Sequence, residues 1–421
     1  MTALRPGATP PLPAEPSGAG GAPAATPGPA RPEAARRSGG PDRAAGPVVT
    51  ELRMSAFASH RGAAFPIGPV TLFAGPAGSG KTNALRAYEA LARLGGGDPL
   101  DEVFPDPAGC VPEGAAADPQ GRRGFRIGCT ADGPAGPVRL DVAVQAEPTL
   151  RIVGERLTAG GETLLTTALR DPGRSMVQAA WHTAGTVPVT RAPLPDDRLG
   201  TALLPLRVAG RTEGQLRVLA AAEQMVVALR SVFACEPQPQ WMRAPVPAGD
   251  GRLRRGCDNL AAVLERTHTQ CVQRHARLVA AAHAGCAGQV TALGVERLGD
   301  GSLRATVGRG GGPATPATPV GRLGDGELRY LALALVLLTG PGVLAVDAVG
   351  EVPSAMQTLT VLADGLDRDL DGRQLRELLS LAVSIGAAGH LRLAGTVTEP
   401  GAVRARETPG VTVVDLDRDR T

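Results

Sequence analysis

The sequence predicts an α/β fold in which one sheet is interrupted by an antiparallel meander and a helical insertion. Strand-like and helix-like segments alternate near residues 69–97 and again over residues 327–416, the order typical of an α/β sheet. Between them, residues 124–170 consist of short alternating apolar and polar runs separated by turn sequences such as DGPAG, which predict a meander. Residues 200–232 and 258–284 have helical periodicity.

The first residues differ in composition from the rest of the chain. Residues 1–48 are dominated by Pro, Ala and Gly, and such a segment buries too little apolar surface to offset its ordering entropy. We therefore expect a disordered tail, with the alternative that translation begins near Met54. The remainder, 49–421, is interpreted as one domain with an N-terminal lobe (49–199), a helical insertion (200–295) and a C-terminal lobe (296–421).

Composition narrows the class of protein. With 43% apolar residues the chain can build a core, and it has no apolar run of about 18 residues for a membrane span. The N-terminus has no apolar segment of the signal-peptide type, so we expect a cytoplasmic protein with no membrane partner. Six scattered cysteines without a C-x-x-C pair indicate reduced, mostly buried thiols. Aromatic residues amount to 2%, which argues against a base-stacking platform for single strands.

The individual elements follow in chain order. Residues 48–60 and 69–75 are predicted strands, and residues 83–97 a helix because Leu85, Tyr88, Leu91 and Leu94 recur at helical spacing; residues 98–122 are a predicted loop. The later predicted elements are a hairpin (291–298 with 302–309), helices at 327–338 and 373–385, and strands at 342–347, 390–395 and 411–416.

The most specific motif is GPAGSGKT, residues 75–82, which fits G-x-x-x-x-G-K-[ST] without a mismatch. It contains Lys81, the single lysine among 44 basic residues; arginine's broad fork does not replace the compact ammonium that reaches the β- and γ-phosphates. Thr82 would hold Mg²⁺. A coincidental glycine-rich turn is the alternative. The nucleotide-binding candidates here are Gly75, Pro76, Ala77, Gly78, Ser79, Gly80, Lys81, Thr82 and Asn83.

Two further segments complete the predicted site. The run GVLAVD ends in Asp347, which we interpret as the Walker-B aspartate that holds the Mg²⁺ shell at the end of a buried strand; an ordinary polar residue at a strand end is the alternative. Upstream, the turn in RLGDGELRYL resembles the signature motif of ABC-type ATPases, which makes Gly324, Asp325 and Gly326 candidates for contact with ATP. The alternative is a plain turn with Asp325 capping the helix.

Together these segments resemble the ABC-type P-loop ATPases of the SMC and RecF kind and, more narrowly, bacterial AAA-family ATPases of RecF/OLD-like organisation. The resemblance covers residues 50–420. It implies a P-loop NTPase fold with an ABC/RecF-like sheet, binding of ATP and Mg²⁺, and an ATP-dependent homodimer. It also implies that hydrolysis drives opening and closing, often in DNA repair or phage defence, with DNA or an effector protein as a partner.

The chain departs from this family at three positions. Gly324 stands where the signature has a serine, Ala348 where a glutamate polarises the attacking water, and Val397 where a switch histidine stands. Because losing such a group commonly costs about 10²–10⁴ in rate, we expect slow ATP hydrolysis or none. Glu351 is our candidate for a substitute base, and Glu399 a weaker one.

Three functions therefore remain open. The first is an ATPase that couples nucleotide state to dimerisation, with Lys81 and Glu351 as catalytic residues. The second is a hydrolysis-deficient, nucleotide-gated binding module, which Ala348 and Val397 favour. The third, a P-loop kinase or other transferase, is disfavoured by the signature-like turn.

One cluster of metal-ligand types is interpreted differently. His268, Cys271 and His275 have a spacing that could bind zinc, but they share a helical stripe with several apolar residues. The stripe is therefore more simply the packed face of a long helix.

Overall fold

The structure is a computed structural model that describes residues 46–183, 188–249, 251–310, 316–340, 343–344 and 358–416. All of these belong to the second of two units into which the chain divides, Ala44–Thr421. The tail predicted at residues 1–48 lies outside the described residues except for its last three positions.

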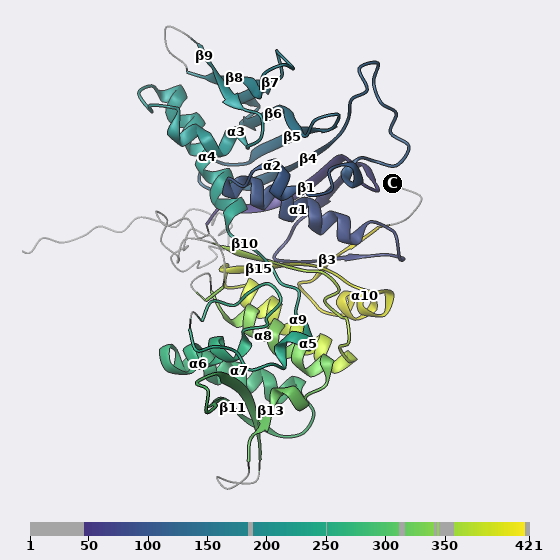
Figure 1. Cartoon of the computed structure of the whole chain (residues 1–421), viewed down its shortest axis with the longest axis vertical. Coiled ribbons are helices and arrows are strands. Elements are labelled where there is room, and N and C mark those ends of the chain that lie inside the picture. Colours follow the sequence, from purple (N-terminus) through teal and green to yellow (C-terminus); the bar gives the residue numbers. More distant parts are fainter. Residues whose placement is uncertain are drawn as a thin grey trace, which may run out of the picture. The chain divides into compact units, whose positions relative to one another are not determined.

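Eight of the described strands form an antiparallel sheet in the order β2-β1-β4-β5-β6-β7-β8-β9 (Figure 1). The predicted meander is confirmed and continues beyond residue 170 through one more hairpin. The predicted strand at 48–60 turns at Ala58, whose φ is 48°, so its last residue begins β2. The strands are β1 (Val48–Phe57), β2 (His60–Pro66), β4 (Arg123–Asp132), β5 (Val138–Glu147), β6 (Arg151–Ala159), β7 (Glu162–Ala168), β8 (Met176–His182) and β9 (Val189–Pro195).

A second sheet is parallel and has the order β10-β14-β15-β3-β16 within the described part of the chain. Adjacent residues of its strands point to opposite faces, so Leu72 and Phe73 of β3 join two different hydrophobic clusters. Burial on both faces explains why these strands are almost entirely apolar. They are β3 (Val70–Ala74), β10 (Val232–Ala234), β14 (Leu359–Ala363), β15 (Leu391–Thr396) and β16 (Thr412–Asp415).

Helices cover both faces of the parallel sheet, and the first hydrophobic cluster joins α8 and α9 to residues of β14 and β15. Residues 200–295 contain several helices, and β10 within them pairs with β14 of the parallel sheet. The longer helices are α1 (Lys81–Gly96), α4 (Glu213–Arg230), α6 (Leu260–Gln270), α7 (Val272–Gly285), α8 (Asp325–Leu338), α9 (Gly372–Gly386) and α10 (Glu399–Arg406).

The remaining elements are short. The predicted loop at 98–122 contains a helical turn because Leu100 and Val103, one turn apart, are buried together. The predicted hairpin is confirmed as β11 and β12. These elements are α2 (Leu100–Val103), α3 (Gly200–Leu203), α5 (Pro239–Met242), β11 (Val290–Arg297), β12 (Leu303–Arg309), β13 (Thr318–Pro319) and the 3₁₀ turns Ala108–Cys110, Leu204–Leu206 and Val320–Arg322.

Helix α1 connects the two sheets. It contacts β1 and β4 of the antiparallel sheet and β10, β14 and β15 of the parallel sheet. The predicted apolar stripe is confirmed, because Tyr88, Leu91 and Leu94 are fully buried and Leu85 is 5% exposed. The helix is therefore held on several sides, which fixes the position of its N-terminus.

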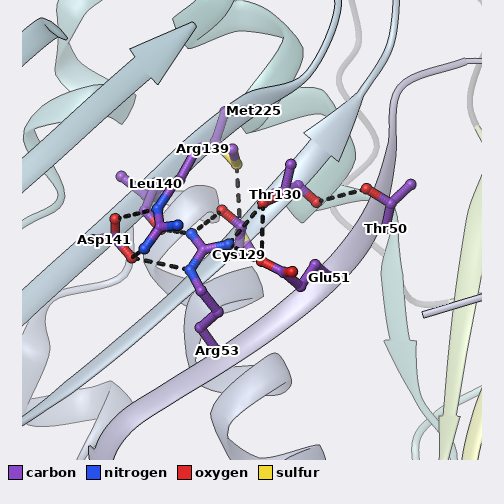
Figure 2. A network of polar contacts seen from close by, with 9 residues as sticks. All are labelled: Thr50, Glu51, Arg53, Cys129, Thr130, Arg139, Leu140, Asp141 and Met225. Atoms are coloured by element: carbon purple, nitrogen blue, oxygen red, sulfur yellow. Dashed lines mark hydrogen bonds and ion pairs between the residues drawn. The ribbon is translucent and has the colours of Figure 1, made fainter. Parts of the chain in front are cut away.

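A buried arginine ties three strands of the antiparallel sheet together (Figure 2). The guanidinium of Arg53 on β1 donates to the carbonyls of Cys129 and Leu140 at 2.9 and 3.1 Å, and to Thr130 Oγ1 at 2.7 Å. It also pairs with the carboxylates of Glu51 and Asp141. Because a buried charge is tolerated only when it is paired and hydrogen-bonded, this network explains an arginine inside the sheet.

Candidate functional site: a phosphate-binding loop at the edge of the parallel sheet

The glycine-rich segment connects the carboxyl end of β3 to the first turn of α1, as the sequence predicts. Gly75 and Gly80 have φ values of 144° and 91°, which residues other than glycine rarely adopt. A Cβ on Gly75 would lie 2.3 Å from the Leu416 carbonyl oxygen, and one on Gly80 2.5 Å from His60 Nε2. Glycine is thus required at both positions by backbone angle and by space.

The ammonium of Lys81 lies on this loop. Its Nζ donates to the carbonyl oxygens of Gly75 at 2.6 Å and Pro76 at 3.0 Å. A cation is therefore held beside the backbone amides of a helix N-terminus, the position where anions are favoured.

The hairpin turn between β1 and β2 braces the start of α1. Nε2 of His60 lies 2.9 Å from the Gly80 carbonyl, and Asn83 donates to Ser59 Oγ at 3.0 Å. Burial lowers the pKa of His60, and because a carbonyl oxygen can only accept a hydrogen bond, Nε2 is the donor in this contact. Asn83, expected to contact nucleotide, is occupied by this bracing contact.

The side chain that reaches Thr82 is an aspartate the sequence analysis did not single out. Thr82 Oγ1 lies 3.2 and 3.1 Å from the carboxylate oxygens of Asp364. Asp364 directly follows β14, and its Oδ1 also accepts a hydrogen bond of 2.6 Å from Thr396 at the end of β15. A hydroxyl and a carboxylate at a shared sheet edge are the hard oxygen ligands that Mg²⁺ takes together with phosphates and waters.

The residue expected in this role was Asp347. Asp347, Ala348 and Glu351 lie outside the described residues, so their expected roles stay predictions. Of the predicted strand 342–347 only Val343 and Leu344 are described, and Leu344 forms an isolated bridge with Leu253. Among the described residues, β15 pairs with β14, which consists of five buried residues followed by Asp364, a signal present in the sequence at TVLAD.

The signature-like turn opens α8. Gly324 and Asp325 are exposed, and Asp325 pairs with Arg243 at 2.7 Å. A Cβ on Gly326 would lie 2.2 Å from the Asp369 carbonyl oxygen, so packing against the segment after β14 accounts for this glycine.

The position expected for a switch histidine follows β15. Val397 is 1% exposed and belongs to the hydrophobic cluster under the parallel sheet, while its N–H donates to the Phe73 carbonyl at 3.0 Å. Its side chain is thus part of the core. Glu399, two residues further, is exposed in the first turn of α10.

A cavity of about 370 Å³ opens beside Thr82 and Asp364. It follows one face of α1 and reaches the carboxyl ends of β10 and β14. The charged residues that line it are Arg86, Glu89, Arg93, Asp106, Glu236, Arg255 and Asp364.

The site consists of a strand, a glycine-rich loop and a helix, together with an aspartate at the end of a second parallel strand. This arrangement binds nucleotide phosphates in P-loop proteins. No protein-family model matches the sequence, and no curated protein matches it.

The spacing of His268, Cys271 and His275 left zinc binding as an alternative. The described residues contain no group of three or more His, Cys, Asp or Glu that could hold a metal ion.

Among solved structures, the chain is similar to several SMC head domains. An SmcHead bound to the C-winged helix domain of ScpA is 12% identical with a TM-score of 0.45, over 83% of this chain and 90% of that one. The SMC head domain from Thermotoga maritima is 12% identical with a TM-score of 0.38, over 85% and 91%. An Smc head domain with an extended coiled coil, bound to the C-terminal domain of ScpA derived from Pyrococcus furiosus, is 8% identical with a TM-score of 0.43, over 85% and 91%.

Across the described residues, no helix has the length and apolar character needed to span a bilayer.

Proposed function

We propose that this protein binds Mg²⁺-ATP at residues 75–82 and hydrolyses it slowly. The observation that carries the proposal is the contact of Thr82 with Asp364 at 3.1 Å, since it joins the loop that would cradle phosphates to a carboxylate suited to Mg²⁺. Lys81 would bind the β- and γ-phosphates, and Thr82 and Asp364 would hold the metal. When bound, Mg²⁺ would neutralise charge on the phosphates.

Slow turnover follows from the residues near the γ-phosphate. With Asp364 as the Walker-B aspartate, the next residue is Gly365, so the glutamate implied by the resemblance is again missing. Val397 is buried in the core. These two observations favour the second candidate, a nucleotide-gated binding module that turns over rarely.

The partners are proposed from the resemblance to ABC-type ATPases. It implies that the turn at 324–326 meets ATP held by a second copy of the chain, and the exposure of Gly324 and Asp325 supports ATP-dependent homodimerisation. Action on DNA or on an effector protein follows from the resemblance alone.

The test is nucleotide binding by the full chain, measured with a fluorescent ATP analogue in Mg²⁺. We expect Lys81→Ala to weaken binding by about 10- to 100-fold, the worth of charge-assisted hydrogen bonds. Lys81→Arg should also lose affinity, because the fork of arginine does not fit a site shaped for an ammonium. Arg376→Ala, on the exposed face of α9, is the matched control and should bind like the parent.

Two results would contradict the proposal. One is a parent protein that binds no ATP; the other is Lys81→Ala with undiminished affinity. Sedimentation of the same samples with and without ATP tests the proposed homodimer. We expect a larger species only in the presence of nucleotide.

A further inference from the structure

Two acidic residues follow neighbouring strands at the same edge of the parallel sheet. Ala234 of β10 is in register with Leu362 of β14, and the N–H of Cys235 donates to the Leu362 carbonyl at 2.8 Å. Glu236 and Asp364 each follow this pair by two residues. Neighbouring strands lie about 4.8 Å apart, so the two acidic residues follow the ends of adjacent strands.

Both side chains face the same space. Glu236, Asp364 and Thr82 all line the cavity of about 370 Å³ beside α1. Among the described residues, Glu236 is therefore an acidic residue one strand away from the proposed metal ligands, whereas Glu399 lies on the exposed first turn of α10.

Glu236 is held by a weak ion pair. Nε of Arg255 lies 3.5 Å from its Oε2, and the same guanidinium also contacts the carboxylate of Glu89. The Arg255 side chain is 55% exposed and that of Glu236 39%. Exposed pairs of this kind contribute little stability, so the carboxylate of Glu236 can leave Arg255 without a large cost.

We propose that Glu236 is the catalytic base of this protein and that Arg255 is a positioning residue that restrains it. This inference rests on the proposed function and supplies the group that Gly365 lacks. The Glu236 carboxylate accepts a proton from water as the water oxygen bonds to the γ-phosphorus. The bond between that phosphorus and the β–γ bridging oxygen breaks, ADP leaves with the electron pair, and the proton passes on to the released phosphate.

The position of Arg255 adds a second expectation. Because it bridges Glu89 and Glu236, its removal frees Glu236 to turn toward the water. Loss of the Glu89 carboxylate instead leaves Arg255 with Glu236 alone. The rate of ATP hydrolysis should therefore rise when Arg255 is removed and fall when the Glu89 carboxylate is lost.

The experiment measures ATP affinity and single-turnover phosphate release on the full chain. Glu236→Gln should lower the rate by about 10²–10⁴, the usual contribution of a positioned base, with affinity for the ATP analogue unchanged. Glu236→Asp should restore part of the rate. Arg255→Ala should raise it by about two- to fivefold, and Glu89→Gln should lower it.

Arg297→Ala is the matched control. Arg297 pairs with Glu265 at 2.8 Å, and the two side chains are 59% and 37% exposed, close to the values of the Arg255–Glu236 pair. This variant should hydrolyse ATP at the parental rate.

The outcomes separate the two proposals. Failure of the parent to bind Mg²⁺-ATP would overturn the proposed function and the role of Glu236 with it. Binding without turnover in the parent would overturn the role of Glu236 together with the proposed slow hydrolysis, and would leave the proposed Mg²⁺-ATP binding in place. Turnover undiminished in Glu236→Gln would overturn the role of Glu236 alone. So would a Glu236→Gln variant in which the Mg²⁺ requirement or ATP affinity changes instead of the rate, because Glu236 would then be a metal ligand.

Discussion

At the scale of single residues, burial decides the reactivity of the six thiols. Cys110, Cys129, Cys235, Cys257 and Cys286 are buried, and Cys271 is partly exposed at the break between α6 and α7. Burial raises the pKa of Cys129 and Cys286 to about 12, and that of Cys110 above its ordinary value. The thiolate is the reactive form, so these side chains are inert in the folded protein.

We therefore expect a thiol-alkylating reagent to modify one cysteine per native chain, at Cys271, and all six after denaturation. Intact-mass spectrometry measures the number of labels, and Cys271→Ser should remove the native label. Rapid native labelling of Cys110, Cys129 or Cys286 would show that the described packing is wrong.

The glycine-rich turn at residues 75–80 could be predicted from the sequence because its conformation depends on local backbone geometry. Gly75 and Gly80 adopt positive φ angles next to a strand end, and this requirement appears directly as a motif. The partner of Thr82 could not be chosen in this way. GVLAVD and TVLAD both consist of an apolar run ending in aspartate, and only pairing with β15 identifies Asp364.

At the scale of elements, the long periodic helices and the alternating strands were predicted well. The short strand β10 was missed because three residues carry no periodic signal, and it forms by pairing with β14. The segments after β10 and β14 are joined to α8 by Arg329, which is 2% exposed. Its guanidinium donates to the carbonyls of Pro237, Gly365 and Arg368 at 2.8, 3.0 and 3.0 Å.

We expect Arg329→Met to lower the free energy of unfolding by about 3 kcal/mol. Methionine fills part of the space but leaves three carbonyls without their donor, and each unsatisfied buried group costs about 1–3 kcal/mol. Burial also lowers the pKa of Arg329, so removing the buried charge recovers part of that loss. Urea denaturation measures the change.

Arg376→Met on the exposed face of α9 is the control and should change stability by less than about 0.5 kcal/mol. An equally small effect of Arg329→Met would mean that Arg329 does not hold the three segments together.

At the scale of the molecule, two hydrophobic clusters lie on opposite faces of the parallel sheet, and α1 belongs to one of them. This arrangement brings the carboxyl ends of β3, β10, β14 and β15 to one edge, where ligands bind in open α/β sheets. The phosphate-binding loop, Asp364 and Glu236 come from segments far apart in the chain. Their meeting depends on strand order, which the sequence pattern alone does not determine.

The most direct test of this account is the Mg²⁺ dependence of ATP affinity in Asp364→Asn and Asp347→Asn. If Asp364 is the metal ligand, Asp364→Asn should lose the affinity that Mg²⁺ adds, by about tenfold or 1.4 kcal/mol, and keep the Mg²⁺-independent binding of the loop. Asp347→Asn should behave like the parent. Loss of the Mg²⁺ effect in Asp347→Asn, with Asp364→Asn unaffected, would contradict the site described for this protein.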